Sequence, residues 1–107
     1  MSTAPKAEIL ELAQMAAYQD GSVVSRQITK ADAGNVTLFA FDTGQELSEH
    51  TAPFDALVHI LDGEAEVSIS GKPFLLKTGH AIILPANLPH ALRAQSKFKM
   101  LLTMIRA

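Results

Sequence analysis

Short runs that alternate between apolar and polar residues recur along most of this chain. The clearest run is 64–70, where Ala65, Val67 and Ile69 share one parity and glutamate and serine occupy the other. A period of two is typical of a strand with one face on a core and one in water. Turn signals recur about every 8 to 12 residues, and between them further strands are predicted at 23–29, 36–42, 54–61, 74–77 and 98–105. We therefore predict an all-β sandwich or barrel.

The first 20 residues follow a different period. Ile9, Leu12 and Ala16 recur at helical spacing, and Asp20-Gly21 supplies a stop signal. We predict one short amphipathic helix of about three turns over 6–18, packed on the outside of the domain.

Composition narrows the class of protein. At 107 residues the chain is expected to form a single domain, 1–107, with a helical segment at 1–20 and a barrel core at 36–106. A net charge of −2 means that the chain lacks the excess of positive charge that would attract nucleic acid or an anionic membrane. Without cysteine, a metal would need His, Asp, Glu or water as ligands. No leader or spanning segment is apparent, so we expect a cytoplasmic protein with neither nucleic-acid nor membrane partners.

The predicted C-terminal strand, 98–105, is apolar on both faces near its end. One parity carries phenylalanine, methionine and leucine, while the other changes from Lys99 to Leu101, Thr103 and Ile105. We infer that one face meets another subunit, which predicts a homodimer through the terminal strands. The alternative is that the N-terminal helix covers this face.

The stretch 79–90 ends in a turn with two prolines, followed by His90. His90 shares its parity with Leu92 and Ala94, so an extended chain aims the imidazole at the core. An inward histidine either pairs its ring nitrogens with neighbouring groups or binds something, commonly a metal.

This stretch resembles the second motif of the cupins, the RmlC-like jelly-roll superfamily. The matching spacing is Gly79, five residues, Pro85, one, Asn87, two, His90, with Asn87 in place of the motif's middle glycine and Ala94 in place of its final asparagine. Asparagine is a tolerable replacement because it also adopts left-handed backbone geometry. The resemblance implies a small cupin: a double-stranded β-helix, or jelly-roll barrel, usually dimeric, with a pocket inside.

The first cupin motif is degenerate. Gly44, His50 and Gly63 match it, but Ala52 and Ala56 stand where the family places a histidine and a glutamate or histidine. His50 and His90 therefore remain as the implied ligands of a divalent transition metal (Zn, Ni, Fe or Mn), with weaker binding than in a complete site.

Parity extends the predicted site. His50, Ala52 and Ala56 all face inward if their segment stays extended, and a ligand pocket is predicted to be lined by Ala52, Ala56, Phe39, Phe41, Leu92 and Met104. Whether the parity of Phe39 or that of Leu38 faces the interior is left open.

The other two histidines fall outside the family pattern. His59 lies on the opposite parity from His50, in the other layer or at a subunit contact, and could become a third ligand only through a bulge. His80 falls in a turn and is expected to be exposed.

Three functions fit these features. The first is a binding module that holds a small molecule, and weakly a divalent metal, through His50 and His90. The second is a metal-dependent oxygenase, isomerase or decarboxylase acting on a small organic acid, which requires a further protein ligand. The third is an interaction protein in which the dimer surface is functional and the cavity vestigial.

Overall fold

The predicted period-two runs form antiparallel strands in a computed structural model that describes residues 3–106. The elements in these residues are η1 (Leu12–Gln14), β1 (Val23–Ala31), β2 (Gly34–Phe41), β3 (Glu46–His50), β4 (Ala56–Ile69), β5 (Lys72–Lys77), β6 (Ala81–Leu84), β7 (His90–Arg93) and β8 (Phe98–Ile105). Within this range no helix is both long enough and apolar enough to cross a membrane.

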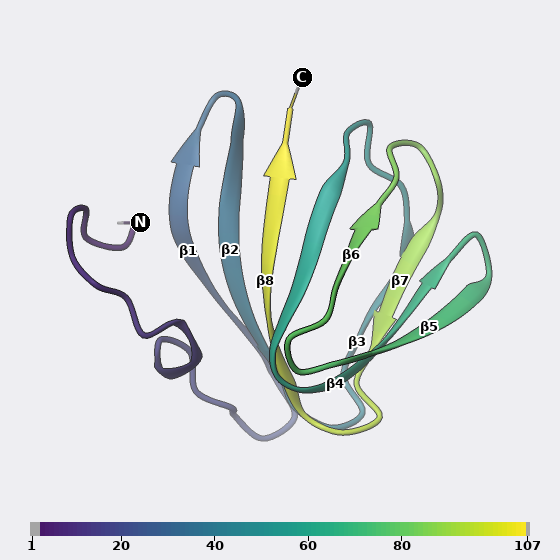
Figure 1. Cartoon of the computed structure of the whole chain (residues 1–107). Coiled ribbons are helices and arrows are strands. Elements are labelled where there is room, and N and C mark those ends of the chain that lie inside the picture. The colour runs from purple at the N-terminus through teal and green to yellow at the C-terminus, as the bar shows by residue number, and fades with distance from the viewer. Residues whose placement is uncertain (1–2, 107) are drawn as a thin grey trace.

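The strands form two sheets that curl toward each other (Figure 1). The first sheet has the order β1-β2-β8-β4-β6, and the second has the order β3-β7-β4-β5. The strands crowd together at the lower end in Figure 1 and spread apart at the upper end, where β7 begins. This all-β jelly-roll barrel confirms the predicted fold class.

One strand belongs to both sheets. The sequence predicts separate strands at 54–61 and 64–70, broken at Asp62-Gly63, but β4 runs through this point without interruption. Its pairing with β8 shifts register between Ile60 and Asp62, and Gly63 has a φ of 77°. The glycine therefore bends a continuous strand from one sheet into the other instead of ending it.

The mostly polar composition of 45–49 predicts a loop before His50, and this prediction is wrong in part because Glu46–His50 forms β3. Among the described residues, this strand lies at the edge of the second sheet and pairs with β7 alone. Its polar side chains are compatible with an edge that faces water. Backbone pairing with β7 overrides the weak strand propensity of these residues.

The apolar packing inside the barrel shows which face of β2 points inward. Phe39 and Phe41 pack with the barrel core, whereas Leu38 and Ala40 face outward into a second cluster beneath the N-terminal segment. The Phe41 ring stacks on the Phe98 ring, with centroids 4.5 Å apart and an interplanar angle of 11°. Both faces of β2 are therefore buried, each against a different partner.

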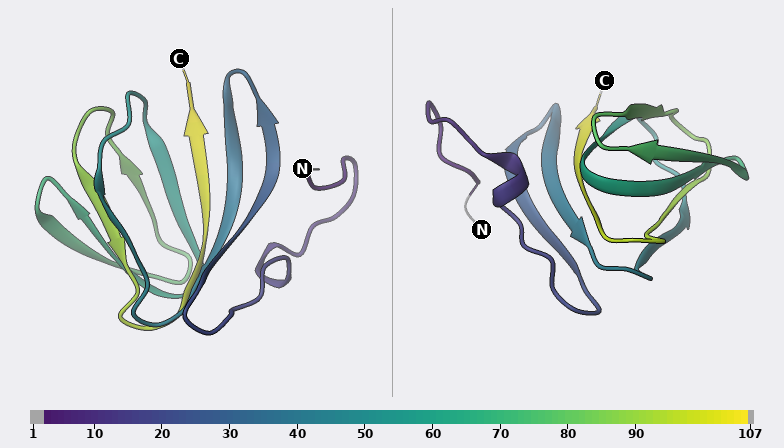
Figure 2. Two further views of the ribbon diagram at one scale, coloured as in Figure 1. Left: turned by 180° about the vertical axis from the view of Figure 1, so that it is seen from behind. Right: turned by 60° about the horizontal axis from the view of Figure 1, so that its bottom comes forward.

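The N-terminal helix is much shorter than predicted, since only the 3₁₀ turn η1 forms. Ala7 adopts a positive φ of 58°, and the Ala4 backbone N–H donates to the Ile28 carbonyl, so the chain before η1 runs along β1. Packing on the sheet outweighs helix propensity here, because a three-turn helix is marginal by itself. In Figure 2 this segment, residues 3–22, lies on the side of β1 and β2 away from the rest of the barrel.

The N-terminal segment covers part of the outward face of β8. The alternative to a subunit contact, coverage of this face by the N-terminal segment, therefore holds for that part. Leu101 is half-buried and packs in the cluster beneath the segment. Ile105, four residues further along the same face, is 62% exposed. The subunit contact predicted for β8 can therefore involve only its end.

Candidate functional site

The two histidines of the cupin-like motifs lie side by side at the start of β7 and the end of β3. His90 opens β7 and is 5% exposed, while His50 closes β3 and is exposed. The strand register pairs them directly, after a bulge between Leu47 and His50. Their Nε2 atoms are 3.2 Å apart, and their rings meet edge to face with centroids separated by 4.4 Å.

The other nitrogen of each ring is engaged by the backbone. His50 Nδ1 lies 2.8 Å from the Ser48 carbonyl oxygen, and His90 Nδ1 lies 3.2 Å from the Leu88 carbonyl oxygen. A carbonyl oxygen can only accept, so each Nδ1 carries the proton and donates it. In the neutral rings, both Nε2 atoms therefore present lone pairs to each other.

The environment of His90 favours this neutral form. Burial lowers the pKa of His90 below its ordinary value, and the adjacent His50 lowers that pKa further, against an opposing effect of the hydrogen bond to Leu88. Two lone pairs that face each other across 3.2 Å repel unless a proton or a metal ion lies between them.

The geometry of the pair fits a divalent metal. Imidazole nitrogens bind zinc at about 2.0–2.1 Å, so two ligands of one ion at tetrahedral or right angles stand roughly 2.9–3.4 Å apart. The observed separation of 3.2 Å falls in this range. Donation of the remote ring N–H to a carbonyl is also the usual way in which proteins orient a ligating histidine.

The structure brings no further ligating side chain to the pair. Among residues 3–106, no group of three or more His, Asp or Glu side chains is placed to hold a metal ion together. Any remaining coordination positions of an ion bound by His50 and His90 would be open to water or a small ligand.

Only one of the two alanines stays on a strand. Ala56 begins β4 and is buried in the barrel core. Residues 51–55 form no strand, so the extended chain on which the predicted parity of Ala52 depends is not present; Ala52 lies in this loop, half-buried. Its carbonyl accepts a hydrogen bond from the Asn87 N–H at 2.7 Å, which ties the loop to the turn before His90.

The remaining predicted pocket residues divide into two groups. Phe41 and Leu92 are buried in the packed core. Phe39 and Met104 pack against that core from inside the barrel but keep part of their surface accessible. These two side chains are therefore not fully covered by the core.

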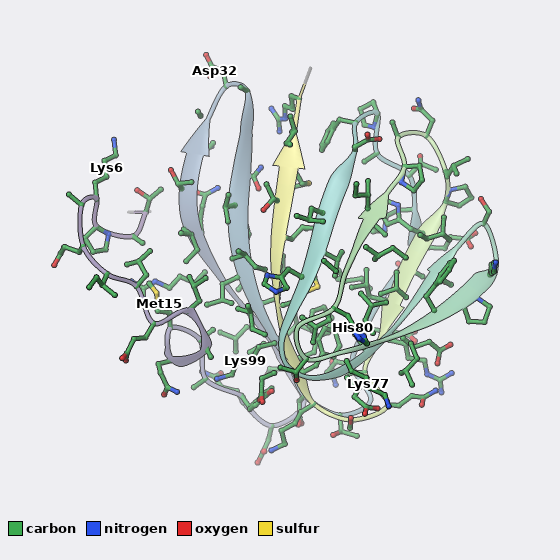
Figure 3. The ribbon with its side chains drawn as sticks, in the orientation of Figure 1. Lys6, Met15, Asp32, Lys77, His80 and Lys99 are labelled. Carbon is green, nitrogen blue, oxygen red and sulfur yellow. The ribbon has the colours of Figure 1, made fainter. Side chains whose placement is uncertain are left out.

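The other two histidines lie away from this arrangement. His59 pairs with Leu101 and Ala81 and takes the outward parity of the first sheet, as expected. His80 is exposed in the turn after β5, where its Nδ1 accepts the Lys77 backbone N–H at 3.0 Å. Figure 3 labels His80 and Lys77. The role of His80 in this turn is structural.

Sequence reasoning missed the part that Asp55 plays. In an extended chain Asp55 faces away from Ala56, which predicts either a solvated charge or, if the side chain bends inward, a carboxylate ligand. Asp55 Oδ1 instead accepts the Ala86 backbone N–H at 2.8 Å. An aspartate directly after Pro53-Phe54 and before a strand is a recognisable turn signal, but its partner 31 residues away is not.

The fold and the paired imidazoles define a small jelly-roll barrel with a candidate metal site at one end. The family model for the cupin domain matches residues 37–106, so the chain belongs to the cupin family. A conserved protein of unknown function from Streptococcus pyogenes is 34% identical, with a TM-score of 0.92 over 100% of this chain and 96% of that chain. This confirms the resemblance drawn from the two motifs.

Two further comparisons involve longer proteins. A cupin 2 conserved barrel domain protein from Leptotrichia buccalis is 41% identical, with a TM-score of 0.88 over 91% of this chain and 47% of that chain. The curated relative, polyketide synthase CurC from Streptomyces cyaneus, is 28% identical over 64 residues. Those residues are 59% of this chain and 42% of that protein, so the chain spans less than half of the curated relative's length.

Proposed function

We propose that this cupin binds a small molecule inside its barrel and holds a divalent transition metal through Nε2 of His50 and of His90. The observation that carries the proposal is the pair of lone-pair nitrogens 3.2 Å apart, each fixed by a carbonyl behind it. Lone pairs that face each other at this distance repel, so an ion between the two rings would stabilise them. When bound, the metal supplies a Lewis-acidic centre with open positions.

Two half-buried apolar side chains would contact the proposed ligand. Phe39 and Met104 supply an apolar surface inside the barrel, and the imidazole pair supplies the polar end. Apolar walls with a few convergent polar groups are the usual lining of a small-molecule site. A small, partly apolar compound with an oxygen or nitrogen donor suits this arrangement.

The test is titration of chelator-treated protein with Ni²⁺, Zn²⁺ and Fe²⁺, followed by calorimetry and thermal unfolding. We expect about one ion per chain and a rise in the melting temperature, since an ion that binds only the folded state stabilises it. His50→Ala and His90→Ala should each abolish both effects. Lack of binding by the wild-type protein, or binding that survives both substitutions, would overturn the proposal.

A metal-dependent enzyme remains the alternative to a binding protein. It requires turnover of an organic acid that depends on the metal, such as dioxygen consumption or release of carbon dioxide, and loss of that turnover in His50→Ala. Binding without turnover across these reactions supports the binding function.

We also propose that the chain forms a homodimer through the outward face of the first sheet at the end of β8. Leu57 and Ile83 pair across β4 and β6 and both point outward, beside Thr103 of β8. Ile83 is 58% exposed. Apolar side chains grouped on a sheet face are typical of a surface that another subunit covers.

A further inference from the structure

Two loops connect the histidines to the rest of the barrel. The loop 51–55 follows His50, and the loop 85–89 precedes His90. Neither loop contains a strand that could hold it in register, because β3 ends and β7 begins at the histidines themselves. The strand register sets the backbones of the two histidines side by side, so the bonds that hold the adjoining loops bear on the orientation of the imidazoles.

Hydrogen bonds fasten the two loops together. The Ala86 N–H donates to Asp55 Oδ1 at 2.8 Å, and the Asn87 N–H donates to the Ala52 carbonyl at 2.7 Å. Asp55 is itself anchored to the barrel wall, since its carbonyl accepts the Ile105 N–H at 3.3 Å. The carboxylate of Asp55 is thus a link from β8 to the loop before His90.

The far end of this link reaches the imidazole. Asn87 takes a left-handed φ of 66° directly after the bond to Asp55, which turns the chain toward Leu88. The Leu88 carbonyl then accepts the His90 Nδ1–H. A displacement of the loop at Ala86 would therefore move the carbonyl that orients the ring of His90.

We propose that Asp55 is the positioning residue of the histidine pair. Its carboxylate holds the loop 85–89 in the one place where the His90 ring meets His50 Nε2 to Nε2, and it ligates no metal itself. The inference deepens the proposed function, and its metal readout rests on that function. Outer partners that orient ligating histidines typically account for about 10- to 100-fold in metal affinity, and we expect a loss of this size when the link is removed.

The chain offers a matched control for the test. The Asp42 side chain also accepts backbone N–H groups, among them that of Gly21 at 2.7 Å, at the other end of β1 and β2. Asp55→Ala and Asp42→Ala both remove bonds from a backbone N–H to an aspartate side chain, and Asp55→Asn keeps an acceptor oxygen in place. The readouts are the imidazole ¹⁵N and ¹H resonances of His50 and His90 in metal-free protein, and calorimetric titration with Ni²⁺.

The expected result is specific to Asp55→Ala. This variant shifts both histidine resonances and weakens Ni²⁺ binding by about 10- to 100-fold, whereas Asp42→Ala and Asp55→Asn retain wild-type spectra and affinity. Unchanged resonances in Asp55→Ala, or equal changes in Asp42→Ala, would overturn the inference. If wild-type protein binds no Ni²⁺, the proposed function fails by itself, and the metal-free resonances still decide the role of Asp55.

Discussion

At the scale of residues, His50 and His90 contribute unequally to the stability of the fold. His90 is buried and its ring satisfies the Leu88 carbonyl, whereas His50 stands in water at the end of an edge strand. Removal of a buried hydrogen-bonding group leaves its partner unsatisfied, and removal of an exposed one does not. The proposed metal binding and the stability of the fold are therefore separable by substitution of one histidine or the other.

We expect His90→Ala to lower the free energy of unfolding of metal-free protein by about 1–3 kcal/mol. His50→Ala should change it by less than about 0.5 kcal/mol. Urea unfolding in the presence of a chelator measures both values, and the two variants should nevertheless lose metal binding equally. A larger stability loss in His50→Ala than in His90→Ala would contradict the described burial of the two rings.

At the scale of elements, the N-terminal segment is fastened to the barrel by a polar contact. The hydroxyl of Tyr18 donates to Asp62 Oδ2 at 2.5 Å, and the Nζ of Lys99 lies 4.9 Å from the centre of the tyrosine ring. Lys99 also donates to the Ala13 carbonyl, and Figure 3 labels this lysine close to Met15 of the segment. The segment and the lower end of β8 are therefore joined at this point.

This contact predicts an unusual tyrosine titration. Burial, followed by the hydrogen bond to and the charge of Asp62, raises the pKa of Tyr18 far above its ordinary value. Because the folded-state pKa exceeds the unfolded value of about 10, the stabilisation is complete below pH 10 and is lost as the pH rises through the raised pKa.

Tyr18 is the chain's one tyrosine, and tryptophan is absent, so tyrosinate absorbance reports on this residue alone. We expect a midpoint above that of a free tyrosine in the folded wild-type protein and a lower midpoint in Asp62→Asn. A wild-type midpoint at about 10 would mean that the segment is not attached through this hydrogen bond.

Gly63 carries a second prediction at this scale. A Cβ at this position would lie 2.3 Å from the Lys97 carbonyl oxygen, whereas a Cβ at Gly71 would meet nothing within 4 Å. The two glycines have similar φ values, 77° and 80°. Gly71→Ala should therefore cost about 1–2 kcal/mol for the left-handed backbone alone, and Gly63→Ala should cost at least about 2 kcal/mol more from the clash with the backbone.

Chemical denaturation measures the free energy of unfolding of Gly63→Ala and of Gly71→Ala. The difference between their losses reports the close approach of β4 to the β7–β8 connection. Equal losses would show that the bend at Gly63 has room for a side chain. Failure of Gly63→Ala to fold, with Gly71→Ala folded, would be the same result at its extreme.

These elements also show what the sequence could and could not predict. The resemblance to the two cupin motifs implied that His50 and His90 face each other, and the register of β3 and β7 does place them side by side. The run at 6–18 was misleading, since helical spacing of apolar residues says nothing about a competing sheet face. The link from Asp55 to Ala86 depends on a contact between distant loops, which periodicity does not encode.

At the scale of the whole molecule, the two sheets present different faces to their surroundings. The outward face of the second sheet carries Glu46, Arg93 and Glu66 in one cross-strand row, as expected for a surface in water. On the first sheet, the N-terminal segment covers the outward side chains of β2, and apolar side chains continue past its edge onto β4 and β6. The polarity of the second sheet makes the first sheet the better surface for a partner copy.

This difference yields a test of the proposed homodimer with a control in the same molecule. Ile83 and Ile105 are 58% and 62% exposed on the first sheet, and Leu75 is 55% exposed on the second. Ile83→Glu and Ile105→Glu should convert a dimer to a monomer in analytical ultracentrifugation, because a buried, unpaired carboxylate at an interface is strongly unfavourable. Leu75→Glu should leave the dimer intact, since its neighbours across the strands are already in water. A wild-type monomer would refute the dimer itself, and dissociation by Leu75→Glu alone would move the interface to the second sheet.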